Sequence, residues 1–83
     1  MFFTYILQSA ESGRYYVGHT GDITRRLLRH NNGMVVSTRN KGPWTLVYQE
    51  SFGTRSGAVG RELEIKSKKS RKYIERLLDG GTV

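Results

Sequence analysis

The chain opens with Phe2-Phe3-Thr4-Tyr5-Ile6-Leu7 and, after a short break, continues with Arg14-Tyr15-Tyr16-Val17-Gly18. Both stretches are rich in aromatic and β-branched residues, which is typical of β-strands. The first stretch is apolar almost throughout, so we expect it to be largely buried on both faces. The residues between them, Ser9 to Gly13, have the composition of a turn. Together they predict an antiparallel hairpin at the start of the domain.

A helix is predicted directly after the hairpin. Asp22 can cap it, because a carboxylate can accept hydrogen bonds from the unpaired amide groups at the start of a helix. Ile23, Leu27 and Leu28 follow at helical spacing. Asn31-Asn32-Gly33 then ends the helix, since these residues tolerate left-handed backbone geometry.

A third strand is predicted over Pro43-Trp44-Thr45-Leu46-Val47-Tyr48-Gln49-Glu50. Its first residue is a proline, whose missing amide hydrogen does little harm at the start of a strand. The residues before it, Met34 to Gly42, show no clear period and are mostly polar. We expect them to form a loop.

Two further helices complete the chain. Thr54 or Ser56 caps the first of them, which runs to about Ser67, and Ser70 caps the second. The apolar stripe of the last helix consists of Tyr73, Ile74, Leu77 and Leu78, and Asp79 to Gly81 ends it.

The predicted order of elements is therefore β-β-α-β-α-α, with no internal repeat and no long linker. A chain of 83 residues has room for one hydrophobic core. These observations predict one domain over residues 1–83, of the α/β class. Its sheet would be small, three-stranded, mainly antiparallel and flanked by helices.

Charge is the clearest guide to the partner. Fourteen lysines and arginines against seven aspartates and glutamates give a net charge of +7. This excess favours a polyanionic partner, nucleic acid before membrane. No apolar run approaches the ~18 residues of a membrane span, and the N-terminus lacks a secretory signal. We expect no membrane association and a cytoplasmic location, and the lack of cysteine excludes thiolate chemistry.

The residues that carry chemistry lie at the ends of the two hairpin strands. The chain has no HExxH, Walker or Gly-x-Ser-x-Gly motif. It does have Thr4-Tyr5-Ile6 and Tyr16-Val17-Gly18, with Arg26 ten residues after Tyr16 and Glu62 on a later helix. This arrangement resembles the GIY-YIG nuclease family.

The resemblance extends over nearly the whole chain. It includes three further segments that are similar to the small single-domain branch of the family: Arg26 to Asn31, Pro43 to Tyr48 and Thr54 to Lys66. Thr4 departs from the pattern, because it replaces the glycine that opens the first half-motif. The tyrosine that carries the chemistry is left in place at Tyr5.

The resemblance implies divalent-metal-dependent hydrolysis of DNA phosphodiester bonds. Glu62 would hold one Mg²⁺ or Mn²⁺ ion, an oxygen-preferring metal that polarises the phosphate. Arg26 offers a fixed positive charge and a fork of donors to the phosphate oxygens. Tyr5 or Tyr16 would act as the general base on a water molecule, and the choice between them is open.

Two residues beside the second half-motif are secondary candidates. His19 directly follows Gly18, and we expect it to help position water or phosphate. Gly18 would let the backbone approach a phosphate closely, although a simple turn explains it equally well.

Each candidate also has an ordinary structural interpretation. Tyr15 and Tyr16 must face opposite sides of the sheet, and Tyr15 is the better core candidate because it shares a face with Val17. Glu62 could form a surface ion pair with Lys66, four residues on. Glu64 is the rival carboxylate.

The basic residues support two functional hypotheses and permit a third. The candidates for contact with nucleic acid are Arg25, Arg29, Lys66, Lys68 and Lys69. The leading hypothesis is a nuclease with DNA as substrate. The second is a DNA-binding module that keeps the nuclease fold without catalysis, and the third is a protein-interaction adaptor. Whether the chain acts as a monomer is left open.

Overall fold

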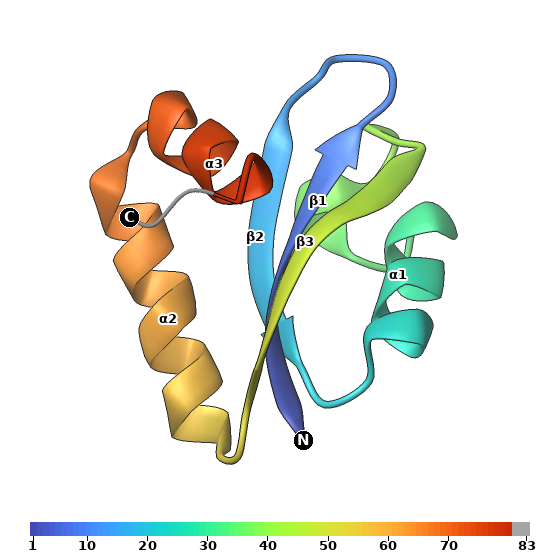
Figure 1. Ribbon diagram of the computed structural model, residues 1–83. Helices are drawn as coiled ribbons and strands as arrows, with labels where there is room; N and C mark the ends of the chain where they lie inside the picture. Colours follow the sequence, from blue (N-terminus) through green and yellow to red (C-terminus); the bar gives the residue numbers. More distant parts are fainter. Residues whose placement is uncertain (81–83) are drawn as a thin grey trace.

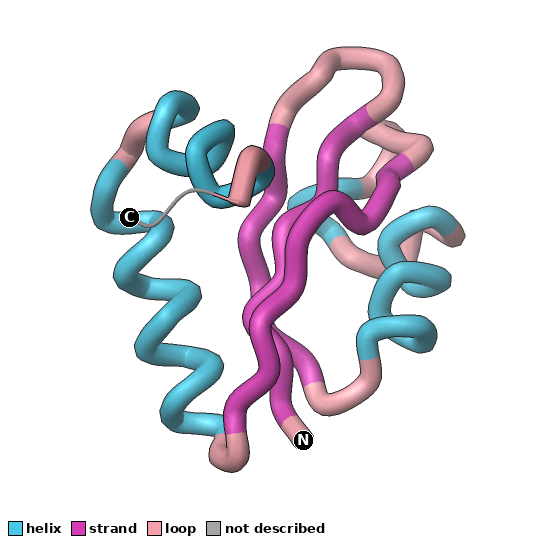
Figure 2. Tube along the Cα trace, in the orientation of Figure 1, coloured by secondary structure: helices cyan, strands magenta, loops and turns pink. Residues whose placement is uncertain are grey.

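Strand β1 (Phe2–Ser9) lies at the centre of a three-stranded antiparallel sheet with the order β2-β1-β3 (Figures 1 and 2). The computed structural model describes residues 1–80. Strand β2 (Tyr15–Thr20) pairs with one edge of β1, and strand β3 (Trp44–Phe52) pairs with the other. The predicted hairpin is confirmed, and so is the burial of the first strand, whose central residues from Thr4 to Leu7 are all buried.

The helices cover both faces of this sheet. Helix α1 (Ile23–Asn31) packs on one face, while α2 (Arg55–Lys68) and α3 (Arg71–Leu78) pack on the other (Figure 1). The fold class and the order of elements are as predicted. One short element was not predicted, a 3₁₀ turn η1 (Val36–Thr38) inside the expected loop. None of the helices within residues 1–80 is long and apolar enough to cross a membrane.

The predicted caps explain where the helices start. Asp22, Thr54 and Ser70 each accept a hydrogen bond from the backbone amide three residues later. Thr54, and not Ser56, is therefore the cap of α2. Helices α1 and α3 are followed by Gly33 and Gly80, both at positive φ, as residues after a helix often are. Gly81, the last residue of the predicted stop, lies outside the described residues.

The structure corrects three details. The strands extend further than predicted, because β1 and β2 continue pairing to Ser9 and Thr20. Strand β3 starts at Trp44 and accommodates a bulge opposite the step from Ile6 to Leu7. Leu28 does not join the buried stripe of α1 but is 58% exposed.

Side-chain alternation along the strands builds a separate core on each face. Ile6 and Val17 pack with Ile65 of α2 and Leu77 of α3. The neighbouring residues point the other way, so that Tyr5 and Leu7 pack with Trp44, Tyr16 and Leu27 beneath α1. Tyr15 joins the first core and Tyr16 the second, as the alternation predicted. The sheet thus separates two layers, and this separation decides which site residues meet.

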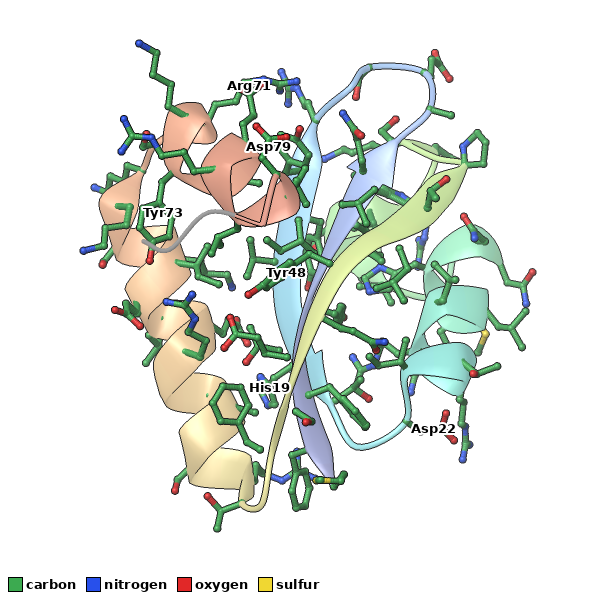
Figure 3. All side chains as sticks on the ribbon, viewed as in Figure 1. His19, Asp22, Tyr48, Arg71, Tyr73 and Asp79 are labelled. Carbon is green, nitrogen blue, oxygen red and sulfur yellow. The ribbon has the colours of Figure 1, made fainter. Side chains whose placement is uncertain are left out.

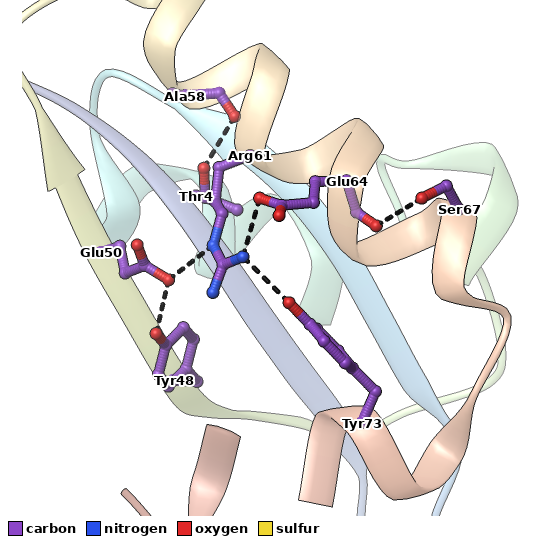
Figure 4. Close-up of polar contacts among 8 residues, drawn as sticks. All are labelled: Thr4, Tyr48, Glu50, Ala58, Arg61, Glu64, Ser67 and Tyr73. Atoms are coloured by element: carbon purple, nitrogen blue, oxygen red, sulfur yellow. Dashed lines mark hydrogen bonds and ion pairs between the residues drawn. The ribbon is translucent and has the colours of Figure 1, made fainter. Parts of the chain in front are cut away.

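Thr4 fastens the central strand to helix α2. Its buried hydroxyl donates a hydrogen bond to the carbonyl oxygen of Ala58 over 2.7 Å (Figure 4). Nearby, Arg61 of α2 donates to Glu50 of β3 and to the Tyr73 hydroxyl of α3. These bonds fix the position of α2 against the sheet, and α2 also carries Glu62.

We expect Thr4→Val to lower the free energy of unfolding by about 1 kcal/mol, the usual net value of one hydrogen bond. Thr45→Val is the matched control, because Thr45 is exposed on β3 and its change should stay within about 0.5 kcal/mol. Urea denaturation of both variants measures the difference. Equal stabilities would show that the bond to Ala58 does not hold α2.

Candidate active site

Gly18 provides the space into which the first tyrosine folds. It lies directly opposite Tyr5 in the β1–β2 register. A Cβ atom at Gly18 would be 2.6 Å from the Tyr5 hydroxyl oxygen and 3.1 Å from Cε2 of Tyr16. The group that lies close to the Gly18 backbone is therefore the Tyr5 side chain. Contact between this backbone and a phosphate stays a prediction.

Tyr5 forms a buried hydrogen-bonded chain with two residues outside the hairpin. Its hydroxyl lies 3.0 Å from Nε2 of His30, and Nδ1 of His30 lies 2.7 Å from the Thr38 hydroxyl. The Thr38 hydroxyl also donates to the carbonyl oxygen of Val35. It therefore accepts from Nδ1–H, which leaves Nε2 to accept the proton of Tyr5. Tyr5 and His30 are each only 2% exposed.

Tyr16 lies beside this pair and closer to the surface. Its ring contacts His30 edge to face, with 4.8 Å between ring centroids, and lies 6.4 Å from the ring of Tyr5. Tyr16 is half-buried. Of the two candidate bases it is thus the one more accessible to water, while Tyr5 is the one with a proton acceptor.

Arg26 supplies positive charge to the same group. It is half-buried on α1, and within residues 1–80 it forms no ion pair. Burial raises the pKa of Tyr5 well above its ordinary value, aided by Tyr16 and Glu62, while the charge of Arg26 opposes this rise. Burial also lowers the pKa of His30 to about 4, and Arg26 and Arg29 add to that effect. At neutral pH both groups are uncharged.

The lowered pKa of His30 predicts a loss of stability in mild acid. The unfolded chain takes up a proton near the ordinary pKa of 6.5, whereas folded His30 does so only near 4. Stability is therefore fully present above pH 6.5 and falls as the pH decreases toward 4, by about 3 kcal/mol in total. Urea denaturation at pH 7 and near pH 5, above the range in which Glu62 titrates, should show much of this loss. The loss should be absent in His30→Gln, and an equal loss in that variant would contradict the assignment.

Glu62 and His19 lie on the opposite side of the sheet. Nδ1 of His19 donates to Oε1 of Glu62 over 2.6 Å, and Nζ of Lys66 donates to Oε2. Burial alone would raise the pKa of Glu62, but the hydrogen bonds from Lys66 and His19 outweigh it and hold the pKa below its ordinary value. Glu64, the rival carboxylate, pairs with Arg61 instead.

The candidate site therefore spans both faces of the edge strand β2. Tyr5, Tyr16 and Arg26 gather on the face of α1, whereas His19 points toward α2 (Figure 3). Between Tyr16 and His19 the strand has Val17, which packs in the core beneath α2 and α3, and Gly18, which carries no side chain. The charge of Glu62 still reaches Tyr5, because it contributes to the raised pKa of that tyrosine. The two groups are electrostatically coupled, although they make no direct hydrogen bond.

The donor set can accommodate one hard divalent cation. Within residues 1–80, no group of three or more His, Cys, Asp and Glu side chains is placed to hold a metal. Glu62 is the available carboxylate, and its side chain is 13% exposed. One of its oxygens is occupied only by Lys66, whose side chain is 48% exposed. A single carboxylate suits Mg²⁺ or Mn²⁺, since such ions retain several waters and bind substrate phosphates.

The basic residues predicted to contact nucleic acid fall into two groups. Arg25 and Arg29 are exposed on α1 beside Arg26. The lysines at the end of α2 have contacts within the protein: Lys66 pairs with Glu62, and Lys68 lies over the ring of Tyr73. Lys69 is the left-handed cap that ends α2. Arg25 and Arg29 thus share helix α1 with Arg26, whereas the lysines lie at the end of α2 on the opposite face of the sheet.

Sequence reasoning missed His30 as a member of the site. His30 is buried, and its Nε2 lies within hydrogen-bond distance of the Tyr5 hydroxyl. A signal was available, because Ile23, Leu27 and His30 stand at i, i+4 and i+7 and so share one face of α1. A polar residue that continues an apolar stripe must find a buried partner.

Two tyrosines of this α/β domain face an arginine-bearing helix, and a glutamate lies on the other side of the edge strand. This combination of topology and site residues is the architecture of a small nuclease domain. Residues 1–74 match the GIY-YIG catalytic domain, and the chain belongs to the GIY-YIG nuclease family.

Its relatives are small proteins of similar length. A UPF0213 protein of Staphylococcus saprophyticus is 38% identical over 94% of this chain and 95% of its own length. A UPF0213 protein of Haloquadratum walsbyi is 40% identical over 96% and 89%, respectively. The solution NMR structure of a UPF0213 protein from Bacillus halodurans is similar to this fold, with a TM-score of 0.58 and 34% identity over 95% of this chain and 84% of that one.

Proposed function

We propose that this protein is a divalent-metal-dependent endonuclease that hydrolyses DNA phosphodiester bonds. The observation that carries the proposal is the position of Arg26. It is half-buried, has no carboxylate partner within residues 1–80, and lies beside the hydrogen-bonded pair of Tyr5 and His30. Partial burial of a cation without a counter-charge is unfavourable, and a bound phosphate would supply that charge.

Each side chain then has a distinct role in phosphoryl transfer. Arg26 binds the non-bridging oxygens and neutralises the charge that develops on them. A tyrosine hydroxyl accepts the proton of the attacking water. Tyr5 and Tyr16 are the two candidates for this role. Tyr16 is the more accessible to water, whereas the buried Tyr5 is held by its hydrogen bond to His30.

Glu62 is the residue that would hold the metal, after Lys66 moves away from Oε2. His19 keeps the carboxylate oriented by donating to its other oxygen. A bound Mg²⁺ or Mn²⁺ supplies Lewis-acid stabilisation of the phosphate and the leaving oxygen. The expected cofactor is one such ion and the expected substrate is DNA.

Incubation of the purified protein with supercoiled plasmid, branched DNA and single strands tests the proposal. We expect cleavage in Mg²⁺ or Mn²⁺ and none in EDTA. Failure to cleave any of the three with added metal would contradict it. Cleavage at equal rates in EDTA would contradict the metal requirement.

A DNA-binding module without catalysis is the second candidate function. It is favoured by one observation, that both oxygens of Glu62 are engaged within the protein. It predicts salt-dependent binding of DNA in EDTA and no cleavage when metal is added. The same preparations therefore distinguish the two functions.

A further inference from the structure

Four arginines from two separate helices line one hollow next to the candidate site. Arg25, Arg26 and Arg29 come from α1, and Arg55 comes from the first turn of α2, on the other side of the sheet. The hollow has a volume of about 390 Å³, and its floor includes Gly21 in the turn between β2 and α1. Sequence reasoning had no means of placing Arg55 in this group.

The positive charge of this hollow is not neutralised by any ion pair within residues 1–80. The five ion pairs among residues 1–80 involve none of these four arginines. Asp22 is the only acidic residue in the lining, and its carboxylate is engaged in capping α1. Arg25 and Arg29 stand at i and i+4 on the helix, a spacing at which like charges repel. Such a cluster is stabilised when an anion binds.

Arg55 is held in position by an aromatic contact. Its guanidinium lies 4.9 Å from the ring centroid of Phe2, at the start of β1. This contact orients the side chain without reducing its charge. The start of α1 adds the partial positive charge of a helix N-terminus to the same hollow.

The lysine-rich end of α2 provides the contrast. Lys66 is paired with Glu62 and Lys68 lies 5.5 Å from the ring centroid of Tyr73. Lys68, like Arg55, keeps its charge, so both surfaces are basic. The hollow is the one that shares Arg26 with the tyrosine side of the candidate site.

We propose that this hollow is a second phosphate subsite, which binds the DNA backbone next to the bond to be cut, with Arg55 as its principal contact outside α1. The proposal rests on the proposed function, which puts the reacting phosphate at Arg26. A strand that passes Arg26 has its neighbouring phosphate within the reach of Arg25, Arg29 and Arg55. Base edges are not required for this contact, so the subsite adds affinity without sequence preference.

The double variant Arg25→Gln/Arg55→Gln tests the subsite by equilibrium binding. Fluorescence anisotropy with a labelled DNA duplex in EDTA should show at least about tenfold weaker binding, since hydrogen bonds to charged groups contribute about 1.5–3 kcal/mol each. The slope of log affinity against log salt concentration should become less steep by about 2, one for each phosphate contact removed.

Lys72→Gln/Arg76→Gln is the matched control. It removes the same charge from exposed positions of α3, on the other face of the sheet. Because charges distant from the strand are screened by salt, its binding should weaken by less than about threefold. Urea denaturation verifies that both double variants are folded. Equal weakening in the two variants, or an unchanged salt slope, would overturn the subsite.

Binding of the protein to vesicles that contain phosphatidylserine is the second measurement. Loss of vesicle binding by Arg25→Gln/Arg55→Gln without loss of DNA binding would overturn the proposal in favour of a membrane surface. The assay needs no metal and no turnover, so its outcome is independent of cleavage. If Arg25→Gln/Arg55→Gln loses DNA binding and the control does not, the subsite is supported even when no DNA is cut. If the protein cleaves DNA but the double variant binds DNA normally, the subsite is rejected and the proposed function stands.

Discussion

Replacing Glu62 with glutamine is expected to lower the rate of DNA cleavage by at least about a hundredfold, because stabilisation of the reacting phosphate by a metal ion is worth several kcal/mol. Glutamine keeps the length and polarity of the side chain but removes the negative charge that attracts a cation. Initial rates of plasmid nicking in Mg²⁺ measure the effect. The folded state should survive, because the partners of Glu62 are the partly exposed His19 and Lys66.

Glu64→Gln is the control for this experiment. Glu64 lies on the same helix two residues further on and is exposed. It pairs with Arg61 and not with a residue of the candidate site. Its replacement should leave the rate within about threefold, since exposed ion pairs contribute little. If the two variants lost activity equally, or neither did, Glu62 would not be the metal-binding carboxylate.

The largest effect on stability is expected from Gly18→Ala. The new Cβ atom would lie 2.6 Å from the hydroxyl oxygen of Tyr5 and 2.8 Å from its Cζ atom, so the buried ring would have to move. Overpacking of this kind costs about 1–3 kcal/mol, and displacement of Tyr5 also breaks its bond to His30. We expect a loss near the upper end of that range, measured by urea denaturation.

Two further variants make this prediction specific. Gly60→Ala should be neutral or stabilise the protein by up to about 1 kcal/mol, because Gly60 lies inside α2 with no atom near the added methyl group. Tyr5→Phe removes the closest clashing atom, so its combination with Gly18→Ala should lose less than the sum of the two single losses. If the losses of unfolding free energy were additive, the destabilisation by Gly18→Ala would not come from its contact with the Tyr5 hydroxyl.

The arrangement of strands and helices could largely be predicted because local rules determine it. The caps at Asp22, Thr54 and Ser70 and the hairpin between the first two strands follow from residue type and spacing. The limits of the strands could not be predicted, because pairing with β1 continues β2 and β3 through residues that have no strand preference of their own. Ser51 of β3 is an example, because the predicted strand ended at Glu50.

The candidate site was predictable only in part, for a reason of geometry. Alternation along β2 indicates that Tyr16 and His19 point to opposite faces, but it does not indicate which helix covers each face. The pairing of His19 with Glu62 and the bond of Tyr5 to His30 both depend on contacts between residues distant in sequence. Arg55 joins the arginines of α1 for the same reason.

A crystal structure with Mn²⁺ and a cleavage-resistant DNA strand tests the central claim most directly, with anomalous scattering to locate the metal. We predict one Mn²⁺ ion bound to the carboxylate of Glu62, with a DNA phosphate between that ion and Arg26 and with Tyr5 or Tyr16 facing the phosphate. A metal ion bound away from Glu62, or a strand that lies on α3 and leaves Arg26 without a phosphate, would contradict the proposed nuclease site.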